Sequence, residues 1–301
     1  MLTRNIASEY GTPVYVYNEK ILRDRMSKVA KVITKYPYTA NYSVKANTNI
    51  HILKLALEEG LNCDAMSVGE ITLLMKAGFP VERIFFVPNN VAPCELAFAL
   101  ENGVMTSLDS LSQLELFGEV CNQMEIAPEN RKCAVRINPG VGAGHHEKVV
   151  TGGKKTKFGI AEYSIPQIFE IAEKYQITIA GINQHIGSLF MDPQPYLDAV
   201  TNLLRIAHQF KNLEFIDFGG GYGIPYHKLN DEKDFPMEDF KSRLEPILDE
   251  FVASYGKAPL FKSEPGRYCV AEGSVILGRV HATKENSGIQ FAGSDIGMNV
   301  L

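Results

Sequence analysis

The sequence predicts a (β/α)8 barrel, and three observations lead to that fold class. Short β-rich runs alternate with amphipathic stretches of helical length, which is typical of repeated βα units and not of a β sandwich. Eight such units can be placed along the chain. The 301 residues accommodate the roughly 250 that a barrel of this kind needs. A doubly wound open sheet is the alternative, because small errors in element boundaries would hide a missing strand.

The eight predicted strands are short runs rich in β-branched, aromatic and other apolar residues, bounded by turn signals. They span residues 39–46, 61–67, 83–88, 104–110, 132–138, 179–187, 215–220 and 260–266. Several of the helical runs between them end in glycine, a common helix stop. Each strand therefore has a helix available to cover it.

Composition narrows the class of protein. Hydrophobic residues make up 45% of the chain, the net charge is −5, and the basic residues are scattered, which argues against a nucleic-acid partner and favours small polar ligands. No run reaches the roughly 18 apolar residues of a membrane helix, and residues 1–10 lack the apolar centre of a signal peptide. We therefore expect a cytoplasmic protein. The five cysteines are widely spaced and never form CxxC, which predicts reduced, packing thiols.

Polar residues follow the predicted strands at their C-terminal ends. They are Lys45, Asp64, Asn89, Asn90, Asp109, Arg136, His185, Ser188, Gly219 to Gly221, Glu264 and Arg267. In a (β/α)8 barrel these ends meet on one face, where the active sites of the fold are built. For Asp109 or Asn89 alone a solvated loop residue is the preferred interpretation. The lysine, histidine, glutamate and arginine together predict a site.

The segment DFGGGYG, residues 217–223, follows the seventh strand. Consecutive glycines let the backbone approach an anion closely and direct N–H groups at it, and loops after strands seven and eight often bind phosphate in this fold. A dinucleotide fingerprint would open the first βα unit instead, so NAD is disfavoured. We expect a phosphate site at Gly219, Gly220 and Gly221.

Lys45 ends the first predicted strand, across the barrel mouth from those glycines. Desolvation disfavours an ammonium ion, so a lysine in a partly apolar setting acts as an amine nucleophile toward a carbonyl. Pyridoxal 5'-phosphate supplies an aldehyde and a phosphate together, and its ring needs an acidic partner at the pyridine nitrogen. Glu264 is the candidate partner. His185 is placed to stack on the ring, and Ser188 and Arg267 to reach the phosphate.

Eight motifs occur in order across nearly the whole chain. They are YSVKAN at 42–47, DSLSQL at 109–114, RINPGV at 136–141, TGGKKTKFGI at 151–160, HIGS at 185–188, DFGGGYGIPY at 217–226, EPGRY at 264–268 and GMN at 297–299. This set resembles the pyridoxal-phosphate decarboxylases of the alanine racemase-like fold, and within them the diaminopimelate decarboxylase branch. The resemblance implies decarboxylation of meso-2,6-diaminopimelate to L-lysine and CO2.

The resemblance also implies residue roles. Lys45 forms the Schiff base with the cofactor, His185 stacks on the ring, and Glu264 pairs with the pyridine nitrogen. Ser188 and Gly219 to Gly221 hold the phosphate, Gly266 lies beside it, and Arg267 serves phosphate or a substrate carboxylate. Arg136 matches an arginine near the ring's phenolate oxygen, and Asp64 an acidic position near the lysine. A homodimer with shared active sites is implied, with an amino acid as substrate, and no metal, nucleic acid or membrane.

The resemblance has two departures. VPNNVA, residues 87–92, stands where the family has a glycine-containing loop, and the chain stops at Leu301, where the family continues into a β-sandwich domain. We therefore expect a truncated chain, with residues 1–25 and 271–301 as the edges of that domain and 26–270 as the barrel. Within these edges the predicted strands are 12–18, 274–283 and 289–297.

Other functions stay open at this stage. The substrate alternatives are lysine, ornithine and carboxynorspermidine, since we expect the residues that discriminate them to lie largely beyond Leu301 or in loops. A non-catalytic pyridoxal-phosphate carrier and a racemase share the fold. A metal enzyme using HHE, residues 145–147, is less favoured, because adjacent side chains rarely ligate one ion together.

Overall fold

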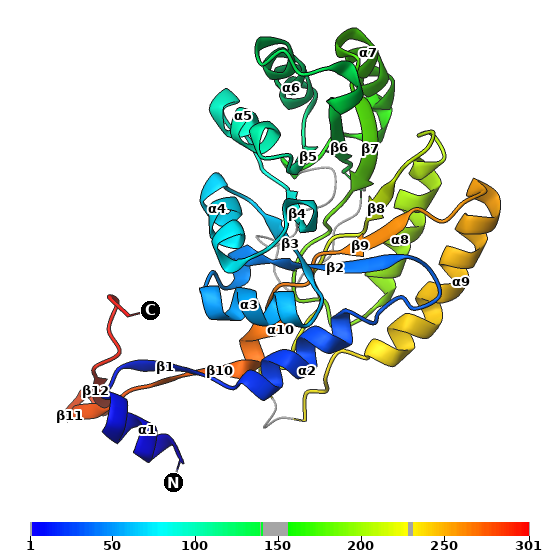
Figure 1. Cartoon of the computed structure of the whole chain (residues 1–301). Coiled ribbons are helices and arrows are strands. Elements are labelled where there is room, and N and C mark those ends of the chain that lie inside the picture. Colours follow the sequence, from blue (N-terminus) through cyan, green and yellow to red (C-terminus); the bar gives the residue numbers. More distant parts are fainter. Residues whose placement is uncertain (1, 139, 141–155, 228–230, 301) are drawn as a thin grey trace.

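The computed structural model describes residues 2–138, 140, 156–227 and 231–300. Its centre is a closed barrel of eight parallel strands, in which neighbours in sequence are neighbours in space and the last strand pairs with the first (Figure 1). The strands are β2 (Tyr38–Ser43), β3 (Asn62–Ala65), β4 (Ile84–Phe86), β5 (Met105–Leu108), β6 (Lys132–Arg136), β7 (Thr178–Asn183), β8 (Phe215–Asp217) and β9 (Leu260–Ser263). The predicted barrel is confirmed, and the open sheet is wrong.

Helices surround the barrel. They are α2 (Glu19–Val29), α3 (Ile50–Glu58), α4 (Val68–Ala77), α5 (Pro93–Glu101), α6 (Leu111–Gln123), α7 (Ile165–Tyr175), α8 (Gln194–Ala207) and α9 (Met237–Tyr255), with the short α10 (Arg267–Val270) after β9. The side chains of Asn49, Ser67 and Ser110 cap the first turns of α3, α4 and α6 by accepting backbone N–H groups. These caps fix where each βα loop at the barrel mouth ends.

The strands separate two apolar clusters, because neighbouring side chains point to opposite faces of a strand. Phe86 belongs to the large cluster that the barrel shares with the helices, whereas Phe85 and Phe215 belong to a small cluster with Val87 and Ala134 inside the barrel. Above this small cluster the interior is polar. Its buried polar residues include Asn41, Ser43, Asp64, Ser107, Asn183, Asp217 and Lys262. Because barrel interiors are usually filled by branched apolar residues, this polar filling marks the functional end.

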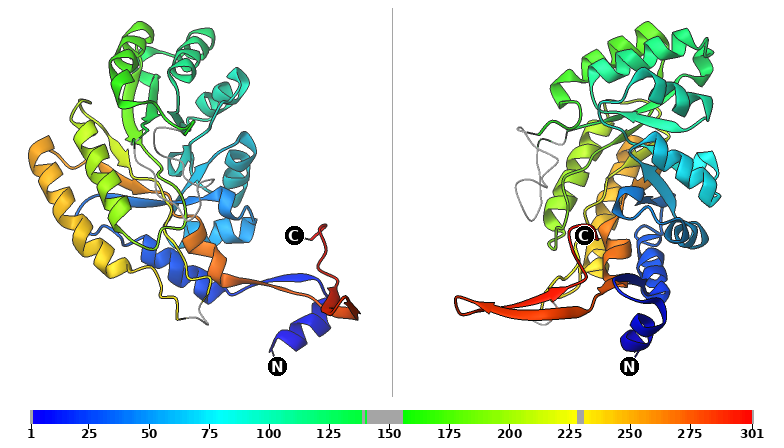
Figure 2. Two further views of the ribbon diagram at one scale, coloured as in Figure 1. Left: turned by 180° about the vertical axis from the view of Figure 1, so that it is seen from behind. Right: turned by 90° about the vertical axis from the view of Figure 1, so that its left-hand side faces the viewer.

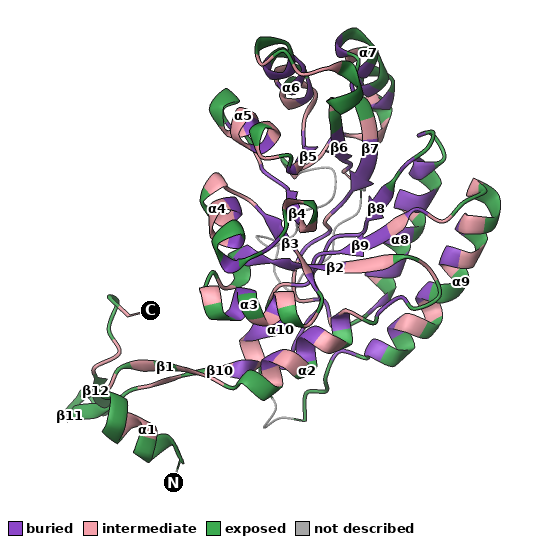
Figure 3. Ribbon diagram, viewed as in Figure 1, coloured by how far each residue is buried: buried purple, intermediate pink, exposed green. Residues whose placement is uncertain are grey.

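The two ends of the chain form an arm that stands away from the barrel. Strand β1 (Val14–Tyr17) pairs antiparallel with β10 (Ser274–Leu277), and β11 (Val280–Asn286) pairs with β12 (Ile289–Ser294). Helix α1 (Leu2–Tyr10) precedes β1, and Figure 2 shows from two further sides that α1 and the β11–β12 hairpin project beyond the barrel. The arm is largely exposed, whereas the barrel strands are buried (Figure 3).

One strand prediction in the arm is wrong. The predicted strand 274–283 is two strands, because the chain changes partner after Leu277, from β1 to β12. Gly278 lies at this break, where a Cβ would overlap Ile296, and the Arg279 N–H donates to Asp295 across 2.8 Å. The predicted pairing of the N-terminal strand with a strand beyond the barrel is confirmed. The domain boundaries at 25/26 and 270/271 stay a prediction.

No helix in the described part of the chain is both long and apolar enough to cross a membrane. Four of the five cysteines are buried, as expected of packing residues, whereas Cys94 is exposed.

Candidate active site

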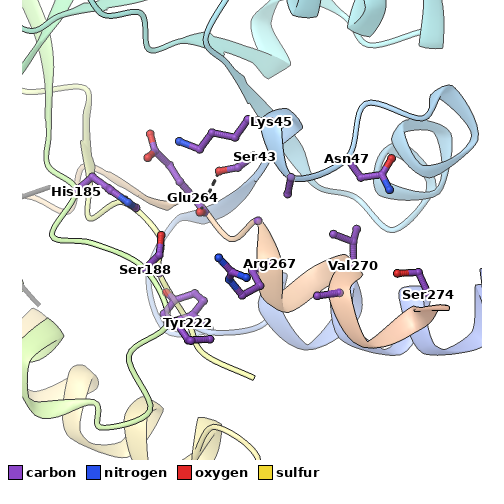
Figure 4. A pocket seen from close by; sticks show the side chains of 15 residues that line it. Ser43, Lys45, Asn47, His185, Ser188, Tyr222, Glu264, Arg267, Val270 and Ser274 are labelled. Carbon is purple, nitrogen blue, oxygen red and sulfur yellow. Dashed lines mark hydrogen bonds between the residues drawn. The ribbon is translucent and has the colours of Figure 1, made fainter. Parts of the chain in front are cut away.

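A cavity of about 530 Å³ opens at the C-terminal ends of the barrel strands. It is lined by Ser43, Lys45, Ala46, Asn47, His185, Ser188, Leu189, Gly221, Tyr222, Glu264, Gly266, Arg267, Val270, Ala271 and Ser274. These come from the segments after β2, β7, β8 and β9 and from the start of β10. Figure 4 shows Lys45, Glu264, His185 and Arg267 directed into the same space. The structure thus gathers residues more than 200 positions apart.

Lys45 stands on a short 3-10 turn and not on a strand. Strand β2 ends at Ser43, and the turn Val44–Ala46 carries the lysine into the cavity, where its side chain is exposed. The predicted strand 39–46 is therefore too long. Because the Lys45 side chain is exposed, burial is not what makes its amine available as a nucleophile. The Ser43 N–H anchors the turn by donating to the Pro265 carbonyl across 3.1 Å.

Glu264 is a buried carboxyl at the end of β9, only 5% exposed. Its Oε1 has no hydrogen-bond partner among the described residues. Burial raises the pKa of Glu264 well above its usual range, Asp217 and Asp64 raise it further, and the cations Lys45 and Arg136 oppose the shift. The group is poised to give a proton to, or share one with, a basic nitrogen in the cavity.

His185 follows β7 and holds a neutral ring. Burial lowers the pKa of His185 well below its usual range, and the neighbouring cations Lys45 and Arg136 lower it further. The Gly220 N–H donates to Nδ1 of the ring across 3.2 Å. A neutral imidazole that accepts at Nδ1 carries its proton on Nε2.

The three glycines after β8 do not play the same part. The Gly219 N–H donates to Asp217 Oδ1 across 2.9 Å, and the Gly220 N–H is directed at His185. The Gly221 N–H has no partner among the described residues, and Gly221 lines the cavity. Side chains are excluded, because a Cβ on Gly219 would overlap the Gln184 carbonyl and one on Gly220 the Glu264 carbonyl. One N–H, and not three, is left for an anion.

Gly266 and Arg267 bring a second backbone segment to the same end of the cavity. A Cβ on Gly266 would lie 3.1 Å from the Ser43 Cβ and 3.2 Å from the Ala46 Cβ, so glycine lets this segment pack against the lysine turn. Arg267 is the first residue of α10, and its guanidinium donates to the Tyr226 hydroxyl. Ser188 lines the cavity from the segment after β7.

Asp64 and Arg136, also predicted for the site, are buried behind the cavity wall. The Ser43 hydroxyl donates to Asp64 Oδ1 across 2.7 Å, and burial raises the pKa of Asp64. The Arg136 guanidinium lies 4.8 Å from the centre of the Phe158 ring. Both are among the charges that act on Glu264. Asp109, whose carboxylate accepts from the Asn89 amide, lies outside this cavity.

The comparison with known families decides the identity of the fold. The family described as "pyridoxal-dependent decarboxylase, pyridoxal binding domain" matches residues 19–271, which include the whole barrel. The chain belongs to this decarboxylase family.

Relatives in this family match nearly the full chain. A diaminopimelate decarboxylase of Methanothermobacter thermautotrophicus is 40% identical over 304 residues, covering 98% of this chain and 69% of the relative. One from Staphylococcus aureus is 32% identical, covering 98% and 70%. The crystal structure of diaminopimelate decarboxylase from Helicobacter pylori complexed with L-lysine has a TM-score of 0.88 at 27% identity, covering 98% of this chain and 73% of that one.

A neighbour of different activity shares the fold. The lysine/ornithine decarboxylase from Vibrio vulnificus complexed with putrescine has a TM-score of 0.80 at 20% identity, covering 97% of this chain and 73% of that one. This likeness shows the fold alone.

The residues of this decarboxylase fit its cofactor, pyridoxal phosphate. The cavity offers an exposed primary amine on Lys45, an unpartnered and buried Glu264 Oε1, and the unpartnered Gly221 N–H. These match an aldehyde, a pyridine nitrogen and a phosphate respectively. An aromatic ring between them would lie against the neutral His185.

Several residues of the decarboxylase site were missed by sequence reasoning. Ser43 lies two residues before Lys45 and faces the barrel interior, a position that strand alternation indicates. Asn47 lies inside the YSVKAN motif, and its Nδ2 donates to the Tyr17 hydroxyl of β1 across 3.2 Å. Tyr222 lies inside DFGGGYGIPY. Ser274 and Ala271 line the cavity from beyond the motifs and had no sequence signal.

Two sequence predictions fall outside the described residues. They are the HHE metal hypothesis at 145–147 and the TGGKK part of the fourth motif at 151–155. Within the described ranges, no group of three or more histidine, cysteine, aspartate or glutamate side chains could hold a metal ion.

Proposed function

We propose that this chain decarboxylates meso-2,6-diaminopimelate to L-lysine and CO2. The observation that carries the proposal is the 40% identity to a diaminopimelate decarboxylase across 98% of the chain. The relatives complexed with L-lysine, from Helicobacter pylori and from Methanocaldococcus jannaschii, support it because L-lysine is the product of that reaction. The meeting of Lys45, His185 and Glu264 in one cavity also supports the proposal.

Pyridoxal phosphate supplies an aldehyde that takes up an amino acid and a protonated ring that accepts the electron pair left when CO2 departs. Around it, Lys45 would hold the aldehyde end from the turn after β2. The Gly221 N–H, Ser188 and the Gly266–Arg267 backbone would hold the phosphate end. Glu264 would face the pyridine nitrogen, and the neutral His185 would cover one face of the ring.

Glu264 holds the decisive proton in this proposal. Its raised pKa favours the protonated carboxyl in the protein interior. A pyridine nitrogen placed beside it shares that proton through a charge-assisted hydrogen bond, which is stronger than a neutral one. Arg136 and Lys45, which favour the carboxylate, stabilise the ion pair that results. Asp64 acts indirectly. It accepts a hydrogen bond from the Ser43 hydroxyl and thereby fixes the turn that carries Lys45.

Arg267 is proposed to bind a substrate carboxylate or the phosphate. Its guanidinium lines the cavity and donates to the Tyr226 hydroxyl. A carboxylate competes well for this fork, because bidentate pairing with arginine is stronger than a single bond to a neutral hydroxyl.

The test is product formation from defined amino acids. The chain loaded with pyridoxal phosphate is incubated separately with meso-diaminopimelate, L-lysine and L-ornithine, and CO2 and amine products are quantified. L-lysine and CO2 from diaminopimelate alone support the proposal. Turnover of L-lysine or L-ornithine in its place would move the assignment to the basic amino-acid decarboxylases, which share the fold.

Lys45→Ala is the matched control for chemistry at the site. It should abolish CO2 release and the visible absorption of the bound cofactor. A chain that binds cofactor through Lys45 yet turns over none of the three amino acids would be a non-catalytic carrier, the other function left open by the sequence.

Two further features stay proposals. A homodimer with shared active sites is proposed from the family resemblance, and light scattering of the purified chain tests it. The exposed apolar side chains of Tyr15, Val275, Val280, Ile289 and Phe291 on the arm support a protein contact there.

The second of these features is location. The composition of the chain predicts a cytoplasmic protein.

A further inference from the structure

Lys262 is a lysine inside the barrel, beneath the candidate active site. It lies on β9 two residues before Glu264, so strand alternation directs both side chains to the interior, and Lys262 is 9% exposed. In the ladder its Cα pairs with that of Asp217 on β8 and that of Thr39 on β2. An interior lysine is costly unless its charge is compensated.

Two aromatic rings flank this lysine. Its Nζ lies 3.8 Å from the centre of the Phe215 ring and 4.9 Å from that of Phe85, and the two rings meet edge to face. Among the described residues the ammonium has no hydrogen-bond partner, so the rings and more distant carboxylates are what compensate its charge. Attraction to the faces of desolvated rings stabilises a cation. Burial lowers the pKa of Lys262, and nearby carboxylates oppose this shift, Asp217 most strongly.

Asp217 connects this lysine to the glycine turn. The carboxyl is fully buried, and it accepts from the Gly219 N–H at 2.9 Å and from the Asn41 amide at 3.2 Å. The Gly219 carbonyl accepts in turn from the Tyr196 hydroxyl at 3.0 Å, so both faces of this peptide segment are held. Whatever changes the charge of Asp217 acts on the turn that presents Gly220 to His185 and Gly221 to the cavity.

We propose that Lys262 and Asp217 form a buried charge pair that positions the glycine turn to receive the cofactor's phosphate. Lys262 is a positioning residue, since it acts through Asp217 and touches neither cofactor nor substrate. Its charge lowers the pKa of Asp217 and so favours the carboxylate, which accepts the Gly219 N–H more strongly than a neutral carboxyl does. The pair lies under the site and leaves the mouth open for ligands.

Other titratable groups also affect the protonation of Asp217, so they must be left unchanged in every variant that is compared. They are Asp64 on β3, Glu264 after β9, and the buried phenols of Tyr38, Tyr196 and Tyr222. Burial raises the pKa of Asp217 to about 7, while the Gly219 N–H, Lys262 and the Asn41 amide lower it. Removing Lys262 therefore raises that pKa further.

The test is cofactor affinity as a function of pH, which does not depend on the identity of the substrate. The full chain is titrated with pyridoxal phosphate between pH 6 and pH 9, with Lys262→Met, Lys262→Arg and the exposed strand lysine Lys132→Met as control. In Lys262→Met we expect the dissociation constant to rise about tenfold at pH 7. The midpoint below which affinity falls should move up by about one pH unit. Lys262→Arg and Lys132→Met should behave as wild type.

A double variant makes the test complete. Lys262→Met/Asp217→Asn removes both charges, so it should fold where a lone buried charge does not, and its affinity should lose the midpoint near pH 7. A folded Lys262→Met with wild-type affinity and midpoint overturns the proposal. If Lys262→Met does not fold, a double variant that folds and keeps the wild-type midpoint overturns it as well. Failure of diaminopimelate turnover leaves this result untouched.

Discussion

The Gly220 N–H donates to Nδ1 of His185 across 3.2 Å, which ties the glycine turn after β8 to the imidazole after β7. This bond places the proton of the imidazole ring on Nε2. It also occupies the Gly220 N–H, which the sequence alone would assign to the phosphate. The conformation of the glycine turn and the orientation of the His185 ring therefore depend on each other. A substitution that moves one of them should also move the other.

Gly220→Ala tests this linkage. The added Cβ would overlap the Glu264 carbonyl oxygen, so the turn has to shift, which disturbs the bond from the Gly220 N–H to His185. We expect cofactor affinity to fall by tenfold or more, as for other changes that misplace a preorganised site. Gly69→Ala on α4 is the control, because its Cβ has room and a helical alanine is favoured by about 0.5–1 kcal/mol over glycine. Equal affinities in the two variants would contradict the linkage.

Glu264→Gln should separate stability from function. Because burial raises the pKa of Glu264, the folded chain binds a proton more tightly than the unfolded chain. The contribution of Glu264 to the free energy of unfolding therefore falls as the pH rises from its pKa in the unfolded chain toward its pKa in the folded chain. Removing the acid should stabilise the cofactor-free chain at pH 8 and change little at pH 4.

The same variant should lower CO2 release by about a hundredfold or more, because glutamine cannot provide the proton to a pyridine nitrogen. Thermal unfolding at the two pH values and single-turnover rates measure both effects. A variant that loses stability at pH 8 would show that Glu264 is structural.

The barrel, and the meeting of several candidate site residues in one cavity, were predictable from sequence because each depends on a local pattern. Eight strands could be placed because their hydrophobic runs are bounded by turn residues, and Lys45, His185, Glu264 and Arg267 could be grouped because parallel strands end on one face. The positions of these residues in the cavity follow from the fold.

The failures have a different physical origin. The end of β2 at Ser43 depends on a hydrogen bond to Pro265, more than 200 residues away, which no local pattern contains. Likewise, the use of the Gly219 and Gly220 N–H groups by Asp217 and His185 is decided by tertiary contacts. The split of 274–283 into β10 and β11 reflects a change of pairing partner, to which the alternation of apolar residues is insensitive.

Ser43→Ala should loosen the turn that carries Lys45. The hydroxyl lies 2.7 Å from Asp64 Oδ1 and 3.2 Å from the Glu264 carbonyl, and all three groups are buried. Losing it leaves Asp64 short of a donor, which costs about 1–3 kcal/mol in a buried setting. Urea unfolding measures the loss, and a several-fold drop in cofactor affinity should accompany it. Ser242→Ala is the control, because Ser242 is exposed on α9 and its hydroxyl donates to the Asp239 carbonyl of the same helix across 2.8 Å.

Arg25 on α2 holds α10, the helix that begins with Arg267. Its guanidinium pairs with Glu272 and Asp234, donates to the Tyr268 hydroxyl across 3.0 Å and lies 4.9 Å from the centre of the Tyr268 ring. Arg25→Met keeps an unbranched apolar stem and removes the charge, so Glu272 loses a cationic partner in a buried setting. We expect a loss of about 3 kcal/mol in unfolding free energy.

The double variant Arg25→Met/Glu272→Gln should recover much of that loss, because a neutral pair avoids the uncompensated charge. Cofactor affinity should follow stability in this series, since α10 carries Arg267 but the clamp touches no ligand. Arg23→Met, at an exposed ion-pair cluster on the same helix, should cost far less. If the double variant is no more stable than Arg25→Met, packing of the arginine on Tyr268, and not charge compensation, is what holds α10 in place.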